Sequence, residues 1–425
     1  MDARRLSGEE SIPFYFGDAQ NGSHFTFELC LSNFSPCPKI YFIPRESTAR
    51  VLAPEDLDYL ERKEALSLPA DHICDHLLRA YFQHVQPLTP ILDIKSFLNH
   101  YVSKHPQKPS ALLIYSIFFA AANFADASTL EATGFPSRKA LKRAMYQRAK
   151  ALWDAEFEDD KITLIQSAIL LSFWYADSTD RAGPWHWAGV AISLCQGLGF
   201  HRSLELVVPD SSKIPAYSRL FRRLWWSCFL RDRWLSVTLG RPMRIHLDDC
   251  DVLMTTDEDV THEWGDIPSD QKDRYLPSGY PLLAGCWVPF VKLTDVLGKI
   301  MALHYSPTKS RLIEPRLRKL KMNFGVVVKS CIPSKNNQTG IFGCTSTIYS
   351  YFMSIPSDLR KFPTGVQLTS KIGPQPSSCI GGIFELCPLT FLLKTASGGK
   401  QRHVSSVALP RTEPRRWLRI SLNLE

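Results

Sequence analysis

The sequence predicts an all-α protein with one large helical domain, residues 66–305, between an irregular lead-in and a basic tail. Six segments of helix length repeat apolar residues at helical spacing. Strand signals are sparse, because no regular series of β-branched runs is joined by Asn-Gly or Asp-Gly turns. The 425 residues are 44% hydrophobic and 22% charged, which is typical of a folded soluble protein with one large core or two modest ones.

Residues 1–65 are predicted to be an irregular lead-in. Turn formers such as Asn21, Gly22 and Pro36 separate short aromatic pieces, for example Phe14-Tyr15-Phe16. The first ten residues mix acids and bases, and no apolar run follows them, so no secretory signal is predicted. We therefore expect the protein to stay inside the cell.

The first helix of the domain is predicted to run from Asp71, as its N-cap, to Val85, because Pro87 and Pro90 end the periodic pattern. The apolar run 111–125 carries Ser116 and falls short of about 20 residues, so it is predicted to be a buried helix and not a membrane span. The predicted helices after the first cover residues 111–124, 138–157, 162–175, 184–198 and 219–239.

The charge is distributed unevenly along the chain. Residues 306–425 hold 18 Lys and Arg against 5 Asp and Glu, a net charge of +13, whereas residues 1–305 hold 32 against 37, a net charge of −5. A basic tail attracts nucleic acid or acidic membrane, yet base composition alone carries no sequence-reading element. Because helical periodicity is lost after Tyr305, this tail is predicted to be poorly ordered or an artefact of the gene model, such as a retained intron.

Motifs of common enzymes are missing from the sequence. Neither the Walker spacing nor Gly-x-Gly-x-x-Gly occurs, and there is no Gly-x-Ser-x-Gly elbow. The eleven cysteines are dispersed without a Cys-x-x-Cys pair, which indicates reduced thiols and no zinc finger. We therefore expect no enzymatic activity and no resident cofactor.

Three clusters of polar side chains are weaker candidates for metal binding or catalysis. Their ordinary interpretation is a solvated helix start or acids that cap helices, which is the favoured one for all three. The clusters consist of Asp71, His72, Cys74, Asp75 and His76, of Asp248, Asp249 and Asp251, and of Asp257, Glu258 and Asp259.

The most informative segment is residues 220–242. It predicts a helix with an apolar face and with arginines on the remaining surface, ended by a glycine that takes a positive φ and by a proline that prevents continuation. The paired tryptophans either stack on single-stranded bases or fill a core while the arginines pair with acids between helices, and the second interpretation is favoured. The key residues are Arg222, Arg223, Trp225, Trp226, Asp232, Arg233, Gly240, Arg241 and Pro242.

These residues resemble the signature of the fungal-specific transcription factor domain, the helical regulatory region of the zinc binuclear-cluster activators. Matching pieces occur in order over about residues 50–305, and several ordered motifs are more specific than one. Residues 77–82 look like the opening helix of the family, and Trp185-His186-Trp187-Ala188-Gly189 looks like its central helix. Residues 199–202 and 231–234 are similar to those of the cutinase and fatty-acid-catabolism regulators.

The resemblance implies a nuclear regulator of genes transcribed by RNA polymerase II. It implies DNA, the transcription machinery or related zinc-cluster factors as partners, with a small-molecule effector as a further possibility and no membrane partner. The six-cysteine DNA-binding cluster of the family is not in this chain, so zinc is expected only if such a cluster lies upstream. The signature residues are expected to be architectural, with Gly240 and Arg241 the most sensitive.

Other functions remain open from the sequence. The chain could regulate through partners without binding DNA, or its basic tail could contact DNA directly, with an affinity that falls steeply with salt. A helical metabolite-binding protein or metal enzyme would instead use the clusters at residues 71–76 or 248–251.

Overall fold

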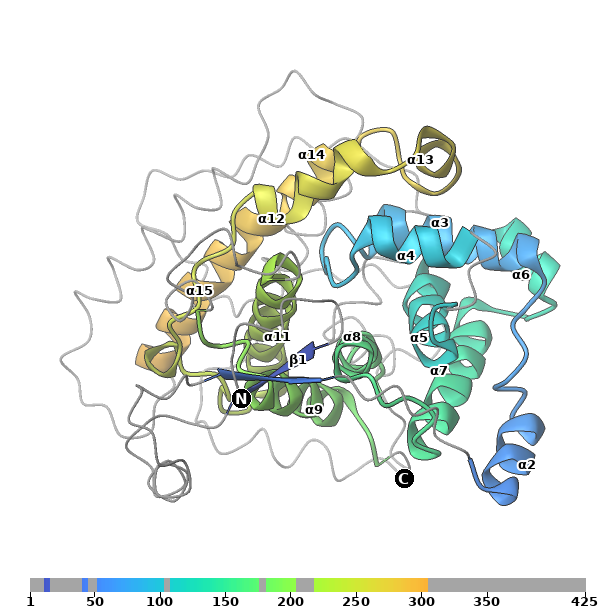
Figure 1. Cartoon of the computed structure of the whole chain (residues 1–425), viewed down its shortest axis with the longest axis horizontal. Coiled ribbons are helices and arrows are strands. Elements are labelled where there is room, and N and C mark those ends of the chain that lie inside the picture. The colour runs from blue at the N-terminus through green and yellow to red at the C-terminus, as the bar shows by residue number, and fades with distance from the viewer. Residues whose placement is uncertain are drawn as a thin grey trace, which may run out of the picture.

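The computed structural model describes residues 11–15, 40–44, 52–102, 108–175, 181–203 and 218–304, so the predicted basic tail lies outside the described residues. The described part is mostly helical (Figure 1). Within the lead-in, strands β1 (Ser11–Tyr15) and β2 (Ile40–Pro44) form an antiparallel pair in which Ser11 lies opposite Pro44. The all-α fold class is confirmed for the helical domain.

Every helix predicted from periodicity is present. The described α-helices are α2 (Pro54–Arg62), α3 (Asp71–His84), α4 (Ile94–Val102), α5 (Ala111–Ala121), α6 (Ala127–Thr133), α7 (Arg138–Asp154), α8 (Lys161–Leu171), α9 (Pro184–Gly197), α11 (Ser218–Leu239), α12 (Glu258–Thr261), α13 (Ser269–Tyr275), α14 (Tyr280–Gly285) and α15 (Trp287–His304). Short 3-10 turns are η2 (Ala122–Phe124), η4 (Leu247–Asp249) and η5 (His262–Asp266).

One prediction about the first helix of the domain was wrong. Ala70, and not Asp71, is the N-cap of α3, because the helix already begins at Asp71 and no side chain caps it. Within the lead-in, the structure describes α2 and the strand pair. Helix α2 begins with Pro54, whose fixed φ suits a first helical position, and Glu55 and Asp56 complement the helix dipole there.

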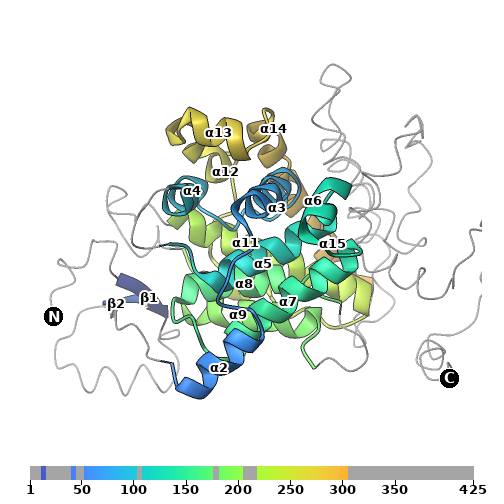
Figure 2. The ribbon, with the colours of Figure 1, turned by 90° about the vertical axis from the view of Figure 1, so that its right-hand side faces the viewer.

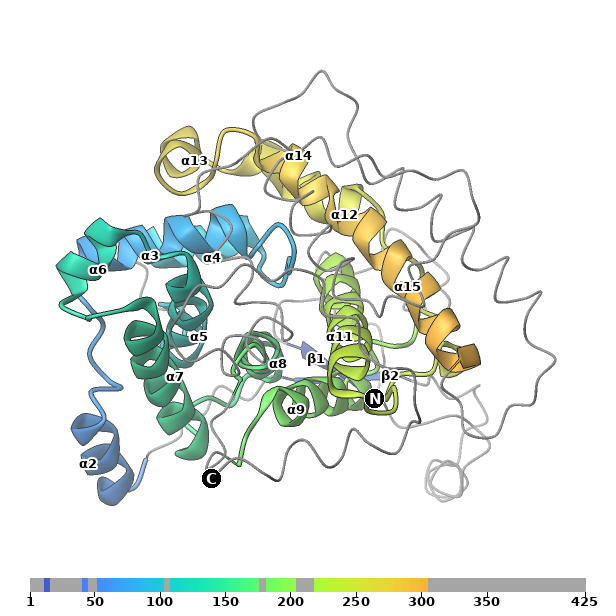
Figure 3. The same cartoon turned by 180° about the vertical axis from the view of Figure 1, so that it is seen from behind.

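The core is a succession of packed helices in the order α7, α5, α8, α9, α11 and α15, as Figure 2 and Figure 3 show from two further sides. Helix α5 is buried from Leu112 to Ala121, which confirms the prediction of a buried helix for this apolar run. Helix α3 packs on α5 and on α13, and α2 lies against α7. Helix α11 therefore occupies the interior of the described domain.

Helix α11 departs from the predicted amphipathic pattern. Every residue from Arg223 to Ser236 is buried, so the arginines do not decorate an outer surface. Neighbouring helices cover this helix on several sides, because α8, α9, α12 and α15 all contact it. Its charged side chains therefore need partners inside the protein.

One described segment, Tyr280–Ala302, is long and apolar enough to cross a membrane by length and mean hydropathy alone. Its most apolar window is 56% buried within the protein, and α15 packs on α11. A core helix of a folded domain has the same properties.

His84 makes the stability of this core dependent on pH. It lies in the last turn of α3 and stacks on Phe124, with 4.5 Å between ring centroids. A helix C-terminus favours a charged histidine, but burial lowers the pKa of His84 from 6.5 to about 4. Because the folded-state pKa is depressed, the stabilisation is complete above about pH 6.5 and is lost as the pH falls toward 4.

We expect acidification from neutral pH to pH 4 to lower the free energy of unfolding by about 2 kcal/mol through His84. Urea unfolding of the protein and of His84→Gln across this range measures the contribution of His84 as the difference between their two pH dependences. His76→Gln is the matched control, because His76 is exposed on the same helix. Equal pH dependence in the wild type and His84→Gln would contradict the assignment.

Candidate functional site

The candidate site is the signature segment, residues 220–242, together with the groups that its side chains contact. The segment forms most of α11 and the turn that follows. Arg223, Arg231 and Arg233 are 1%, 4% and 4% exposed, so three guanidinium groups lie inside one helical domain. Buried charges of this kind are tolerated only when they are paired and hydrogen-bonded. We call these three residues, with Arg222 and Asp232, the arginine network.

Asp232 fixes the chain that returns after α11. Its carboxylate accepts the backbone N–H groups of Arg244 and Ile245 at 3.1 Å and a hydrogen bond from Nη1 of Arg233 at 2.6 Å. Burial raises the pKa of the Asp232 carboxyl, while the hydrogen bond from Ile245 and the charge of Arg233 oppose that rise. The ionised form is the one that this set of donors requires, so Asp232 acts as an anchor for residues 244–245.

Arg233 is held at both ends of its guanidinium. Nη2 donates to the carbonyl of Ile245 at 2.7 Å, and the guanidinium lies 4.3 Å from the ring centroid of Phe229. Burial lowers the pKa of Arg233, and the charge of Asp232 opposes that change. Helix α15 approaches this side chain at Gly298, where an added Cβ would lie 2.5 Å from Nε of Arg233. Gly298 therefore provides the space in which the arginine lies.

Two further arginines join the first half of α11 to the segment 255–266. Nη1 of Arg222 donates to both carboxylate oxygens of Asp259, at 2.9 and 3.2 Å. Nη2 of Arg223 donates to Glu263 at 2.9 Å, and the other oxygen of Glu263 accepts the N–H of Ile94 at 2.5 Å at the start of α4. These pairs connect α11 with α12, η5 and α4, which confirms the predicted pairing of arginines with acids between helices.

Arg231 belongs to the same network, although the sequence analysis did not single it out as a signature residue. Its Nε donates to Oγ of Ser172 at 2.9 Å, and its Nη2 donates to the carbonyl of Ser172 at 2.5 Å. Ser172 is the C-cap of α8, where carbonyl groups lack partners within the helix. The guanidinium of Arg231 thus donates hydrogen bonds to the C-terminal end of α8. It also lies 4.1 Å from the ring centroid of Phe173.

The tryptophan pair fills the core. Trp225 and Trp226 are both buried, and Nε1 of Trp226 donates to the carbonyl of Leu253 at 2.9 Å. Stacking on single-stranded bases requires open ring faces, so that alternative is wrong for these two side chains. Their role in the structure is packing, with one hydrogen bond to the segment before α12.

The turn after α11 brings two parts of the resemblance into contact. Gly240 has φ +62°, as expected from its position at the end of the helix, whereas Arg241 and Pro242 are exposed. The guanidinium groups of Arg241 and Arg244 lie 5.3 and 4.1 Å from the ring centroid of Trp185 on α9.

Gly189, one helical turn beyond Trp185, allows Arg244 to lie against α9. An added Cβ at Gly189 would lie 1.7 Å from Nη1 of Arg244. The central-helix motif, residues 185–189, therefore packs against the chain at and just after the glycine–arginine–proline turn, residues 240–244. This contact is not predictable from the sequence, because neither motif indicates by itself what it packs against.

Gly240→Val is expected to lower the free energy of unfolding by about 2 kcal/mol, because a β-branched residue is disfavoured at positive φ. No heavy atom lies within 4 Å of an added Cβ at Gly240, so the cost comes from the backbone alone. Gly265→Val is the matched control, since Gly265 also has open space and no left-handed backbone. Thermal melting of the two variants measures the effect, and equal shifts would show that the backbone of Gly240 is not responsible.

The polar clusters proposed from the sequence have structural roles. No group of three or more His, Cys, Asp or Glu side chains that could hold a metal is present among the described residues. Asp75 is buried and accepts hydrogen bonds from Arg274 and Tyr275, which attach α3 to α13. His72 and His76 are exposed on α3.

The acids near residue 250 also do not converge on a common centre. Asp248 and Asp249 are exposed, whereas Asp251 accepts the N–H of Ser203 at 2.7 Å and pairs with Arg202 at 2.9 Å. Asp259 is the partner of Arg222 described above. In the described part of the chain Asp251 and Asp259 therefore join segments to one another.

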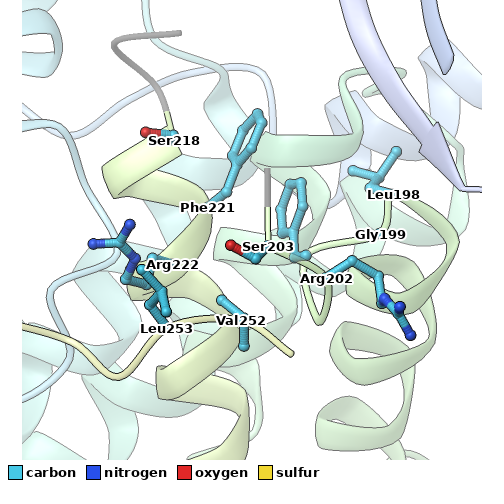
Figure 4. A pocket seen from close by; sticks show the side chains of 10 residues that line it. Leu198, Gly199, Arg202, Ser203, Ser218, Phe221, Arg222, Val252 and Leu253 are labelled. Carbon is cyan, nitrogen blue, oxygen red and sulfur yellow. The ribbon is translucent and has the colours of Figure 1, made fainter. Parts of the chain in front are cut away.

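A small hollow lies where the start of α11 meets residues 198–203 and 252–253 (Figure 4). It encloses about 20 Å³, which is room for about one water molecule. Phe221, Val252 and Leu253 supply much of its apolar wall, and Arg202 and Arg222 extend away from it on opposite sides (Figure 4). A hollow of this size does not accommodate a metabolite.

Fold and site together define a helical domain that is held together by buried ion pairs around one central helix. The family described as the fungal specific transcription factor domain matches residues 78–332, and the chain belongs to this family. The resemblance inferred from the signature segment is thus confirmed. The matched range extends beyond residue 305, and the division into segments 1–65, 66–305 and 306–425 stays a prediction.

Several curated fungal regulators are similar to the chain. Cutinase transcription factor 1 beta of Fusarium vanettenii is 38% identical over 215 residues, which cover 50% of this chain and 24% of that protein. Cutinase transcription factor 1 alpha of the same fungus is 35% identical over 254 residues, 59% of this chain and 26% of that protein. The acetamidase regulatory protein of Aspergillus fumigatus is 36% identical over 200 residues, 46% of this chain and 24% of that protein.

The chain matches about a quarter of the length of these relatives. No solved structure matches it. These relatives are named as transcription factors or as a regulatory protein.

Proposed function

We propose that this chain is the regulatory part of a nuclear transcription regulator that acts on genes of RNA polymerase II. The family match over residues 78–332 carries this proposal. The similarity to two cutinase transcription factors supports a place among regulators related to these two proteins. DNA reading and zinc binding would belong to a six-cysteine cluster outside the described helical domain.

In this proposal the signature residues form a scaffold and do not contact a ligand. Arg222, Arg223, Asp232 and Arg233 are engaged with one another or with neighbouring elements. A scaffold of buried ion pairs suits a regulatory domain that switches between conformations. Such packing favours a few distinct conformations over continuous deformation. An effector or partner would then act by binding one arrangement better than another.

A reporter assay tests the regulatory proposal. The full chain is fused to a heterologous DNA-binding domain in a fungal host, and transcription from a promoter with the matching site is measured. We expect transcription to rise or fall relative to the DNA-binding domain alone. The variant Asp232→Ala, which is expected to destabilise the scaffold, should weaken the effect. Unchanged transcription at equal protein levels would contradict the proposal.

A regulator that works through partners without binding DNA is the second candidate. The observation that favours it is that the signature side chains suited to nucleic-acid contact, Arg223, Trp225 and Trp226, are buried in the core. Co-purification with a full-length relative from the same fungus would support this candidate. Binding of the purified chain to DNA with steep salt dependence and little sequence preference would instead assign DNA contact to the basic tail.

A further inference from the structure

Two adjacent threonines precede α12, and the structure exposes only one of them. Thr255 and Thr256 lie at the end of residues 250–256, a stretch without regular secondary structure. Thr255 is 2% exposed, whereas Thr256 is exposed. A non-helical segment with an outward hydroxyl group is the form in which a modifying enzyme reaches a side chain.

The residues after Thr256 are three consecutive acids. Asp257 and Glu258 are exposed, and Asp259 is buried against Arg222. Kinases select substrates largely by the charge pattern around the hydroxyl group, and acids on its C-terminal side complement a basic substrate groove. The sequence around Thr255 is almost the same, so burial is what distinguishes the two threonines.

We propose that Thr256 is a phosphorylation site for a serine/threonine kinase that selects acidic substrates, and that its phosphate releases α12 from α11. In this reaction Oγ of Thr256 forms a bond to the γ-phosphorus of ATP while the bond to the oxygen of the departing ADP breaks. The hydroxyl proton passes to the catalytic base of the kinase. The inference is independent of the proposed role in transcription, because it depends only on the geometry around Asp259.

The contacts of Asp259 show why a phosphate would act as a switch. One oxygen of its carboxylate accepts the backbone N–H of Thr256 at 2.8 Å and the hydroxyl groups of Thr255 and Thr256 at 3.3 Å. Phosphorylation removes the hydroxyl donor of Thr256 and introduces a charge of about −2 beside this carboxylate. The two anions repel each other, so the arrangement around Asp259 cannot persist.

Two arginines on the first turns of α11 face the same segment. Arg222 pairs with Asp259 at 2.9 Å, and Arg219 pairs with Glu258 at 2.6 Å. A phosphate on Thr256 competes with both carboxylates for these guanidinium groups, since phosphate accepts stronger hydrogen bonds at higher charge. Helix α12 has only four residues, so it has little stability of its own once these pairs change partners. Arg222 and Leu253 also line the small hollow (Figure 4).

The test uses the full purified chain with casein kinase II and Mg-ATP, followed by peptide mass spectrometry. We expect phosphate at Thr256 with at least about tenfold lower occupancy at Thr255, which must wait for local opening. Thr256→Ala should abolish the modified peptide, and Thr255→Ala should retain it. Hydrogen exchange should then become about tenfold faster in α12 after phosphorylation and return to its original rate after phosphatase treatment.

Two results would overturn the inference. Failure of the folded chain to accept phosphate at Thr256, or equal phosphate at both threonines, would refute the site. Unchanged hydrogen exchange in a chain phosphorylated at Thr256 would refute the release of α12. Neither result depends on the reporter assay, so failure here is distinguishable from failure of the regulatory proposal.

Discussion

We expect the replacement of Asp232 by alanine to lower the free energy of unfolding by about 4 kcal/mol, because it removes the carboxylate that pairs with the buried guanidinium of Arg233. The same change leaves the N–H groups of Arg244 and Ile245 without their acceptor inside the protein. Chemical denaturation of the full chain, followed by tryptophan fluorescence, measures the loss.

Two comparison variants separate this effect from a general loss of charge. Asp154→Ala removes an acid that is half exposed and pairs with Lys150 on the same helix, so its expected cost is below about 0.5 kcal/mol. The double variant Asp232→Ala/Arg233→Met removes both buried charges and should recover part of the stability. If Asp232→Ala and Asp154→Ala proved equally mild, the anchoring role of Asp232 would be wrong.

Gly298→Ala is expected to destabilise the domain by about 3 kcal/mol, although alanine is the better helix former. The new methyl group would lie 2.5 Å from Nε and 3.0 Å from Cδ of Arg233. This arginine cannot move aside, because Asp232 and the carbonyl of Ile245 hold both ends of its guanidinium. Overpacking and the loss of these bonds therefore exceed the gain in helix propensity.

Gly197→Ala provides the matched control. Gly197 is the last residue of α9, and an added Cβ there meets nothing within 4 Å. Its replacement should stabilise the protein by up to about 1 kcal/mol. Thermal melting of the two variants compares them directly, and stabilisation by both would disprove the steric role of Gly298. In an Arg233→Ala background, where the colliding Cδ and Nε atoms are absent, Gly298→Ala should cost little further stability.

The helices were predictable because their signals are local. The apolar spacing within residues 71–85 and 111–124, and the glycine and proline breaks that end such runs, depend only on neighbouring positions. The missed N-cap shows the limit, since Asp71 has the right chemistry but lies one residue inside the helix. The strand pair was missed because its two strands are far apart in the chain and each is only five residues long.

The arginine network was only partly predictable. Arg222 and Arg223 were expected to pair with acids, but their partners Asp259 and Glu263 lie 37 and 40 residues away. A local pattern of charge on a helix resembles a solvated face, so the burial of α11 on nearly all sides was not expected. Gly298 and Gly189 carry no signal of their own, because a glycine within a helix looks only like a weak helix former until the arginine beside it is known.

The sequence separation of the network has a consequence for synthesis of the protein. When the ribosome has made residue 240, α11 is complete as a sequence, but Asp259, Glu263 and the glycine that makes room for Arg233 have not yet been translated. The start of α4 also lacks its partner at this stage, because the N–H of Ile94 donates to Glu263, which is 169 residues away. We therefore expect the nascent domain to complete its packing only after Gly298 has left the exit tunnel, with the tryptophan-rich α11 exposed until then.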